Sequence, residues 1–382
     1  MKIIGIICEY NPFHLGHQKQ FDLLRQQYGE DCAIVCLMSG NFVQRGTPAI
    51  FDKAYRAAAA AVCGADLVLE LPVTYALSSA EGFAAGGVRI LSQMCDGLCF
   101  GTENGNVESL MDTARALLSP EFSQQLHRQL DTGISFPAAR QAALATMGAD
   151  TSLLRCANDI LAVEYCKAIV DQNSPLQPIP IHREGSYHAE IPDAQNPSAT
   201  SVRQLLLAEK PWQDFVPEAA RQHFEDAPIH DLSQGEQAIL YRLKTMTDAE
   251  FEALPYGAEG LWRKLMRASR EYASLEEIIT ATKSKRYTYT RLSRMILCAF
   301  LGITAQDLQG KPPYVRVLAF REQGRAILKQ AREQGQFPHI GEKMDDPYWT
   351  LEQRCDRLYP LFSEASPQKG ILSKDRRIWI QP

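Results

Sequence analysis

The sequence lacks paired cysteines at metal-binding spacing and any apolar stretch long enough to cross a membrane. Its ten cysteines are scattered and form no Cys-x-x-Cys pair, which argues against a structural zinc site or a disulfide framework. We therefore predict reduced, mostly buried thiols in a cytoplasmic protein, and no metal ligand set. The apolar start, residues 3–8, is cut short by Glu9 and Asn11. We expect neither a secretory signal nor a membrane partner.

Neither sign of charge prevails, and two catalytic motifs are missing. Lys and Arg number 40 against 45 Asp and Glu, a net charge of −5. This balance excludes a uniformly basic protein that coats nucleic acid, but it allows a local basic face. No G-x-G-x-x-G follows the first predicted strand, which argues against a dehydrogenase. No G-x-S-x-G or Cys–His arrangement offers a covalent nucleophile.

Strand-like and helix-like segments alternate over the first two hundred residues. Buried strands are predicted at 3–8, 33–38, 67–71, 97–100 and 179–181, and helices at 16–28, 52–63, 80–94, 158–169 and 198–207. This rhythm is typical of an α/β fold with a doubly wound parallel sheet. The domain would span residues 1–210, with a helical insertion at about 106–150. Helical periodicity, also read over 314–331, predicts an all-helical domain at 211–382.

The most informative segment directly follows the first strand and runs from Glu9 to His17. A helix is predicted to start near Gly16, and the free N–H groups of a helix start attract phosphate. Gly16 removes a side chain where a nucleotide would approach. His14 and His17 are three residues apart, so they face one side of the turn and can donate hydrogen bonds to phosphate oxygens. The pattern favours nucleotide binding; the alternative is a plain turn with two surface histidines.

This segment resembles the H-x-G-H signature of the adenylyltransferase and class I synthetase superfamily, which implies a nucleotidyltransferase (HUP-like) fold. With the string at 39–46 and Phe100-Gly101-Thr102-Glu103, it further resembles the bacterial tRNA(Met) cytidine acetate ligase family over the whole chain. The resemblance implies a ligase that activates acetate with ATP as acetyl-adenylate, and Mg²⁺ is expected to accompany ATP. The enzyme would then acetylate the exocyclic amine of the wobble cytidine of elongator tRNA(Met), giving N4-acetylcytidine. Leu15 departs from the family, which more often has Asn there.

The resemblance also implies the residues that contact ATP. They are Ile7, Cys8, Glu9, Tyr10, Asn11, Pro12, Phe13, His14, Leu15, Gly16, His17, Gly101, Asn158, Arg183 and Glu184. From the residues alone, Gly101 is also typical of a turn, Asn158 can cap the helix predicted to start there, and Arg183 with Glu184 can be a solvated pair.

The run from Ser198 to Arg203 resembles the second superfamily signature, usually I-S-S-x-x-I-R. Ser198, Thr200 and Ser201 are expected to hold the β- and γ-phosphates, and Arg203 to clamp charge. The predicted catalytic residues are therefore His14, His17 and Arg203. A capping run without a ligand is the alternative.

Basic residues predict contacts to RNA. Arg45, in the loop at 39–46, would contact phosphate or tRNA, unless it is only a solvated arginine of a mobile loop. Basic residues and interleaved tyrosines in the C-terminal half are expected to bind phosphates and stack on bases. The predicted contacts are Lys283, Lys285, Arg286, Tyr287, Arg291 and Arg294, with Tyr289 among them. The alternative is a solvated helix face.

Two further functions compete with the ligase. A small-molecule adenylyltransferase, which moves AMP from ATP to a phosphorylated acceptor, shares both signatures but leaves the basic helical tail unexplained. A non-catalytic RNA-binding protein on a decayed nucleotide fold does not explain the intact histidine pair and Gly16. The sequence does not predict an oligomeric state.

Overall fold

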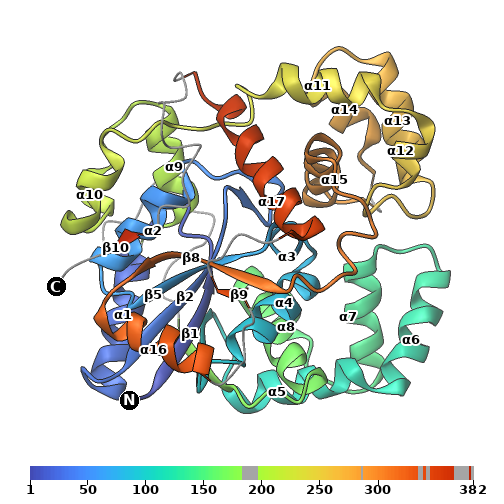
Figure 1. Cartoon of the computed structure of the whole chain (residues 1–382). Helices are drawn as coiled ribbons and strands as arrows, with labels where there is room; N and C mark the ends of the chain where they lie inside the picture. The colour runs from blue at the N-terminus through green and yellow to red at the C-terminus, as the bar shows by residue number, and fades with distance from the viewer. Residues whose placement is uncertain (183–196, 285–286, 334–338, 341–344, 365–377, 380–382) are drawn as a thin grey trace.

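A computed structural model describes residues 1–182, 197–284, 287–333, 339–340, 345–364 and 378–379 (Figure 1). Its centre is an eight-stranded sheet in the order β10-β8-β5-β2-β1-β6-β7, with β9 beside β8. The strands are β1 (Ile3–Cys8), β2 (Ala33–Ser39), β5 (Leu67–Leu71), β6 (Gly97–Thr102), β7 (Gln177–His182), β8 (Tyr314–Phe320), β9 (His339–Ile340) and β10 (Ile378–Trp379). A separate hairpin joins β3 (Phe42–Val43) to β4 (Thr47–Pro48).

The five strands β5-β2-β1-β6-β7 are all parallel, which confirms the doubly wound sheet. The chain builds outward from β1 through β2 to β5, and then returns to place β6 on the other side of β1. This reversal is a topological switch point. In such sheets ligands bind at the carboxyl ends of the strands on either side of it. Here those ends are the residues after Cys8 and around Gly101.

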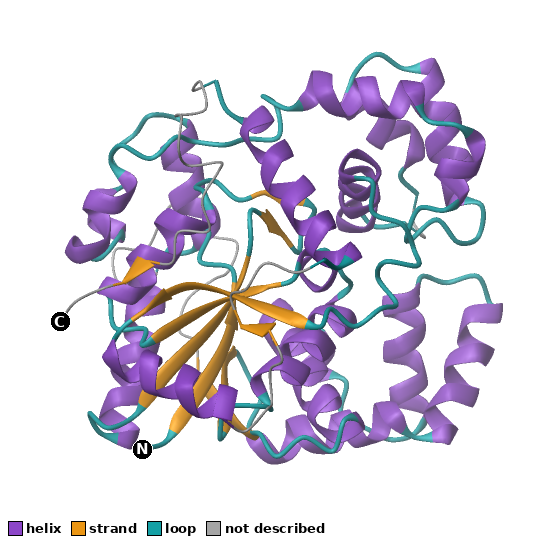
Figure 2. Ribbon diagram, viewed as in Figure 1, coloured by secondary structure: helices purple, strands orange, loops and turns teal. Residues whose placement is uncertain are grey.

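Helices cover both faces of the sheet (Figure 2). Alternate side chains of β1 explain this: Ile3 and Ile7 join one buried cluster, and Ile4 and Ile6 join the other. The helices of this part are α1 (Leu15–Tyr28), α2 (Lys53–Val62), α3 (Val73–Ala76), α4 (Ala80–Leu91), α8 (Ala157–Asp171), α9 (Ala199–Leu207) and α10 (Glu218–Phe224). Asp52 caps α2, as its type predicts, by accepting a hydrogen bond from the Ala54 N–H at 2.8 Å.

The predicted insertion at 106–150 forms three helices, and a second helical group lies beside the sheet (Figure 1). The insertion holds α5 (Val107–Leu118), α6 (Pro120–Asp131) and α7 (Phe136–Thr146). The second group holds α11 (Glu236–Thr245), α12 (Asp248–Glu252), α13 (Leu261–Glu271), α14 (Leu275–Thr282) and α15 (Tyr289–Leu301). Later in the chain, α16 (Glu322–Glu333) packs on the central sheet, where Ile327 and Leu328 join the same buried cluster as Ile3 and Ile7, and α17 (Pro347–Leu358) follows it (Figure 1). The helices α11–α15 and α17 share a third buried cluster.

The prediction that everything after residue 210 is helical is wrong for Tyr314–Phe320. This segment is strand β8, which pairs antiparallel with β5 at the edge of the central sheet. Its apolar residues fit helical and extended spacing equally, and the edge of β5 decides between them by offering backbone partners. Within the predicted helical run 314–331, the helix begins only at Glu322, as part of Glu322–Glu333. The C-terminal part of the chain therefore completes the sheet as well as forming the helical group.

Eight of the ten cysteines are buried, as predicted, and Cys8 and Cys156 are half-buried. In the part of the chain that the structure describes, the helices are too short or too polar to span a bilayer.

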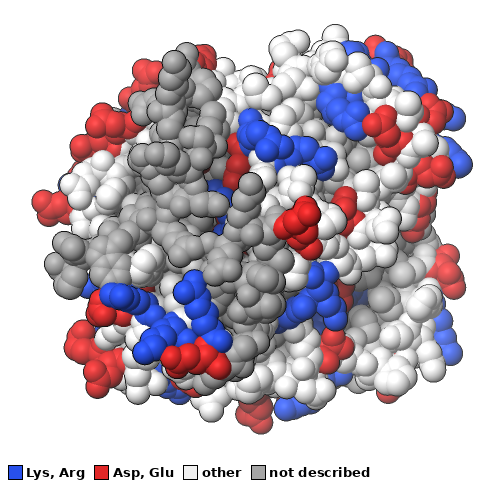
Figure 3. Space-filling model, viewed as in Figure 1, with Lys and Arg blue, Asp and Glu red and all other residues white. Residues whose placement is uncertain are grey.

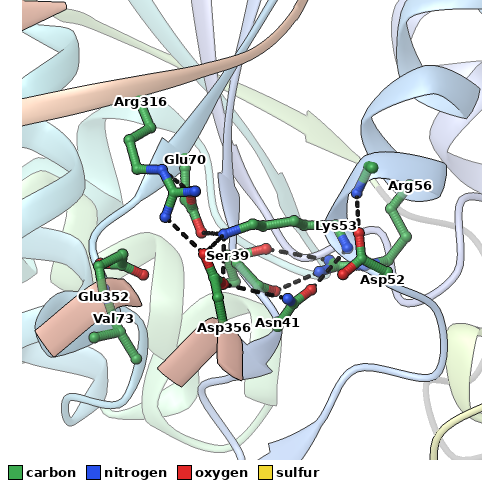
Figure 4. Close-up of polar contacts among 12 residues, drawn as sticks. Ser39, Asn41, Asp52, Lys53, Arg56, Glu70, Val73, Arg316, Glu352 and Asp356 are labelled. Carbon is green, nitrogen blue, oxygen red and sulfur yellow. Dashed lines mark hydrogen bonds and ion pairs between the residues drawn. The ribbon is translucent and has the colours of Figure 1, made fainter. Parts of the chain in front are cut away.

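A buried cluster of charges connects α17 and β8 to α2 and β5, which come earlier in the chain (Figure 4). The Lys53 ammonium lies 2.8 Å from Glu70 Oε1 and 2.6 Å from Asp356 Oδ1. Arg316 Nη1 donates to Asp356 Oδ2 at 2.9 Å, and its Nε lies 3.2 Å from Glu70 Oε2. Glu352 Oε2 accepts from the Val73 N–H and the Tyr314 hydroxyl. Two cations thus balance two carboxylates, which favours a protonated Glu352 as the fifth member.

The Glu352 carboxyl is expected to make stability depend on pH. Burial, then the nearby Glu70 carboxylate, raises its pKa to about 8. Between about pH 5 and pH 8 the folded state therefore holds a proton that the unfolded chain has released, so its contribution to stability falls as pH rises and is constant above that range. Glu352→Gln, which mimics the protonated form, should lose this slope. Urea unfolding at pH 6 and 8.5 measures it. The exposed Glu333→Gln is the control, and a slope retained by Glu352→Gln would contradict the assignment.

Candidate active site

The turn between β1 and α1 orders two histidines. His14 caps α1: its Nδ1 accepts a hydrogen bond from the Gly16 N–H at 3.1 Å. His17 reaches back, and its Nδ1 accepts from the His14 N–H at 3.2 Å. The two rings stack with their centroids 3.8 Å apart. A Cβ on Gly16 would lie 2.9 Å from the His14 ring, so the glycine makes room for this arrangement.

These hydrogen bonds fix where the imidazole protons lie. Each Nδ1 accepts a backbone N–H, so in the neutral ring the proton is on Nε2. Both rings are then Nε2–H donors, the form that can stabilise negative charge on a phosphate oxygen. His14 is 1% exposed, its ring accepts from the Gly16 N–H, and its own N–H donates to the His17 ring. The pair is therefore ordered before any ligand binds.

A cavity of about 340 Å³ opens at the switch point, and both histidines line it. Its walls come from the end of β1, the start of α1, the end of β6, the start of α8, the end of β7 and the start of α9. The volume is in the range of small-molecule sites. Pro197 and Ser198 bring the start of α9 to the same cavity. The N-termini of α1 and α9 thus face one space, where their dipoles favour an anionic ligand.

Most of the residues predicted to contact ATP that the structure describes line this cavity. They are Ile7, Cys8, Glu9, Tyr10, Asn11, His14, Gly16, His17, Gly101, Asn158 and Ser198. Pro12, Phe13, Leu15, Thr200 and Ser201 do not line it. Phe13 is fully buried in the core under the turn, where it packs edge-on against Tyr10. Arg183 and Glu184 lie outside the described residues.

The run from Ser198 to Arg203, predicted as the second superfamily signature, begins with the N-terminal cap of α9. Ser198 Oγ accepts from the Ser201 N–H at 3.1 Å, and the two hydroxyls are 3.0 Å apart, a capping box. Arg203 Nη1 donates to the Asn11 carbonyl at 2.6 Å, and its Nη2 donates to the Thr200 hydroxyl at 3.1 Å. Arg203 does not line the cavity. It holds the backbone of the histidine turn, so the structure gives it a positioning contact.

The prediction that Asn158 caps α8 is wrong. The helix begins at Ala157, its N-cap is Cys156, and Asn158 is the second helical residue. The Asn158 side chain instead donates through Nδ2 to Glu103 Oε1 at 2.6 Å. Glu103, Cys156 and Asp159 bring ligand atoms within 4.8 Å of one another, a spacing that a metal ion could use. The carboxylates already accept hydrogen bonds from Asn158, Thr102 and backbone N–H groups, so we assign no metal there.

The structure adds cavity residues that sequence reasoning missed. Lys19 on α1 lines the cavity and was not predicted. Arg45, which was predicted to contact phosphate or tRNA, lines the cavity as well. His182 ends β7 at the same edge, and the carboxyl end of a predicted strand was the signal for it. Phe83 and Tyr165 supply an apolar wall from α4 and α8. Nothing in their spacing marks these two, because ordinary core residues have the same pattern.

The basic C-terminal stretch divides between core and surface. Tyr287 is 9% exposed and donates its hydroxyl hydrogen to the Glu259 carbonyl, so its ring is not presented to a base. Arg294 is 9% exposed and lies over the Tyr256 ring. Arg291 donates to the Tyr256 carbonyl through Nε and Nη2. For Tyr287 and Arg294 the prediction of a direct RNA contact is therefore not supported, because burial removes them from the surface.

Other members of the stretch stay on the surface. Lys283 is exposed, and Tyr289 is 50% exposed. Lys285 and Arg286 lie outside the described residues. Basic and acidic side chains are interspersed on the visible face over α11–α15, without one continuous basic patch (Figure 3).

Comparisons with known proteins agree on one family. The family model described as HIGH Nucleotidyl Transferase matches residues 1–374. Curated relatives named tRNA(Met) cytidine acetate ligase include proteins of Clostridium novyi, 37% identical over 88% of this chain and 89% of the relative, and Clostridium tetani, 35% identical over 98% and 99%.

Solved structures agree. The crystal structure of Thermotoga maritima TmcAL (apo, form I) has a TM-score of 0.92 at 28% identity, with 100% of both chains covered. The same protein bound with alpha-thio ATP has a TM-score of 0.88 with the same identity and coverage. The chain therefore belongs to the HIGH nucleotidyl transferases and, within them, to the tRNA(Met) cytidine acetate ligases.

Proposed function

We propose that this protein is an ATP-dependent ligase that activates acetate and acetylates the wobble cytidine of elongator tRNA(Met), forming N4-acetylcytidine in the cytoplasm. The observation that carries the proposal is the stacked histidine pair beside two helix starts in one cavity. The names of the relatives and the alpha-thio ATP bound to the Thermotoga maritima protein support it. Membership of the family by itself does not identify the substrates, so they are part of the proposal.

The geometry suits attack of acetate on the α-phosphate of ATP. The Nε2–H groups of His14 and His17, the helix starts, Lys19 and Arg45 offer donors and positive charge for the triphosphate. Acetate oxygen forms a bond to the α-phosphorus as the bond to pyrophosphate breaks, and no protein nucleophile is needed. The cytidine amine then attacks the acetyl carbon, releases AMP and loses a proton.

Mg²⁺ is proposed to accompany ATP. Among the described residues that line the cavity, Glu9 is the only carboxylate, and its Oε1 accepts the Gln44 N–H at 2.8 Å. Mg²⁺ usually keeps several waters and binds through substrate phosphates with one or two carboxylates. Glu9 therefore fits as the protein ligand, and the ion would neutralise phosphate charge.

The helical group is proposed to bind the tRNA, with residues 1–210 and the returning β8 as the ATP-binding part. Arg294 Nη1 donates to the carbonyl of Gln44, whose neighbour Arg45 lines the cavity. Tyr289 lies about one helical turn before Ser293, since Ser293 Oγ donates to the Tyr289 carbonyl at 3.1 Å. An exposed ring thus lies a short distance from the cavity rim, where it can stack on an unpaired base of the anticodon loop.

Mass spectrometry of tRNA tests the proposed function. The protein is incubated with ATP, labelled acetate and elongator tRNA(Met), and the nucleosides are analysed. We expect labelled N4-acetylcytidine, together with ATP–pyrophosphate exchange that requires acetate. The adenylyltransferase alternative instead predicts pyrophosphate release that requires a phosphorylated small molecule and leaves the tRNA unchanged.

Tyr289→Ala is expected to weaken use of tRNA while acetate-dependent ATP–pyrophosphate exchange stays intact. Base–aromatic stacking contributes about 1–3 kcal/mol, so the KM for tRNA should rise roughly tenfold. Tyr241→Ala is the matched control, because Tyr241 is 72% exposed on α11 of the same helical group. Equal KM values for the two variants would remove Tyr289 from the proposed tRNA surface.

A further inference from the structure

The orientation of the Asn158 amide is fixed by one carboxylate. Asn158 Nδ2 donates to Glu103 Oε1 at 2.6 Å, and the Asp159 N–H donates to Glu103 Oε2 at 3.1 Å. An ionised carboxylate only accepts hydrogen bonds, so the NH₂ end of the amide must face Glu103. The carbonyl oxygen Oδ1 is the end that remains.

That oxygen is the acceptor that Asn158 can offer to a ligand in the cavity. Asn158 lines the cavity, whereas Glu103, to which its NH₂ group is turned, does not. Among the described residues, none donates a hydrogen bond to Asn158 Oδ1. The structure therefore leaves Oδ1 as the acceptor that Asn158 can offer at the wall formed by the end of β6 and the start of α8.

Glu103 is itself held in place. Asp159 is fully buried and accepts from the Thr102 hydroxyl, from the Glu103 N–H at 2.8 Å and from Asn104 Nδ2 at 2.9 Å. Burial alone would raise the pKa of Asp159, but the hydrogen bonds from Thr102 and Asn104 outweigh it and hold the pKa below its usual range. An ionised Asp159 thus locks the end of β6 to α8, and Glu103 has little freedom to turn.

We propose that Glu103 is a specificity-determining positioning residue, which orients Asn158 so that its Oδ1 accepts a hydrogen bond from a donor on the nucleoside of ATP. The donor is the exocyclic amino group of adenine or a ribose hydroxyl. This inference rests on the proposed ATP site. If the donor is the adenine amino group, a purine with a 6-oxo group in its place would put its own carbonyl oxygen opposite Asn158 Oδ1, and two acceptors would then face each other.

Glu103→Gln tests the proposal without changing size. The Asp159 N–H cannot turn, so the single oxygen of the new amide must stay opposite it. The new NH₂ group then faces Asn158, whose amide must flip to accept from it and so turns its own NH₂ group to the cavity. The variant exchanges the acceptor for a donor at one atom position.

The measurement is the affinity of each protein for ATP, ITP, 2′-deoxy-ATP and 3′-deoxy-ATP by calorimetry. If the adenine amino group is the hydrogen-bond donor, the ATP-to-ITP affinity ratio should fall about 10–100-fold in Glu103→Gln. If a ribose hydroxyl is the hydrogen-bond donor, the ATP-to-ITP affinity ratio should be unchanged, and the preference for ATP over one of the two deoxy analogues should fall. Each ratio is taken on one preparation, so an inactive fraction cancels.

Glu108→Gln, on an exposed residue of α5, is the matched control and should change neither ratio. Unchanged ratios in Glu103→Gln would overturn the proposal. Failure of the proposed function looks different: the wild-type protein would bind none of the nucleotides, or would bind ATP but acetylate no tRNA.

Discussion

Replacing His17 by alanine is expected to slow acetate-dependent ATP–pyrophosphate exchange by about 10²–10³-fold, the usual effect of losing one preorganised donor to developing negative charge. The His17 ring is held by the His14 N–H and by stacking at 3.8 Å, so its Nε2–H is aimed before ATP arrives. In the proposed reaction, negative charge grows on the phosphate oxygens as pyrophosphate leaves. The exchange assay isolates this step because it requires no tRNA.

His127→Ala is the control, because His127 lies on α6 and does not line the cavity. His14 needs a gentler change, since it also caps α1. His14→Asn keeps a capping side chain and removes the imidazole. We expect it to slow exchange by a similar factor with an unchanged melting temperature. Wild-type exchange rates in both His17→Ala and His14→Asn would remove the phosphate role of the pair.

Lys53→Met is expected to lower the free energy of unfolding by about 3–5 kcal/mol, the range observed when one partner of a buried ion pair is removed. Its ammonium side chain is 9% exposed and contacts Glu70, which is 1% exposed, and Asp356. Methionine fills the same space but leaves Arg316 as the only cation for two carboxylates. Urea denaturation at constant pH measures the loss.

The matched control is Lys329→Met. Lys329 is 78% exposed and lies 3.8 Å from Glu333 in an i, i+4 pair, and such surface pairs contribute about 0–1 kcal/mol. A Lys53→Met protein as stable as Lys329→Met would show that the cluster does not hold α17 and β8 to the sheet.

Much of the site could be predicted because it depends on local order. The strand Ile3–Cys8 is buried on both faces, so a continuous apolar run marked it. The turn after it must start a helix, and His14 and Gly16 sit where that helix needs a cap and space for the His14 ring. Spacing alone therefore placed the two histidines side by side. The same local rule identified Ser198 as a helix cap.

Other parts depended on residues that are distant along the chain. Tyr314–Phe320 has apolar spacing that suits a helix or a strand, and the free edge of β5 selected the strand. Tyr287 and Arg294 belong to a basic, aromatic stretch, yet packing against Glu259 and Tyr256 buries them. Asn158 was predicted as an ATP contact from the family resemblance. Its hydrogen-bond partner Glu103 lies 55 positions earlier, and no local sequence pattern connects the two.

By itself, the sequence determined the parallel sheet and the helix-starting turn with its two histidines, because hydrophobic periodicity and helix capping act over a few neighbouring residues. Only the tertiary structure decided which end of the Asn158 amide meets Glu103, which tyrosine stays exposed, and how Arg316 of β8 and Asp356 of α17 come together with Lys53 and Glu70. Burial and contacts with distant segments of the chain set those outcomes. Such contacts form only when the chain folds, so local sequence patterns do not encode them.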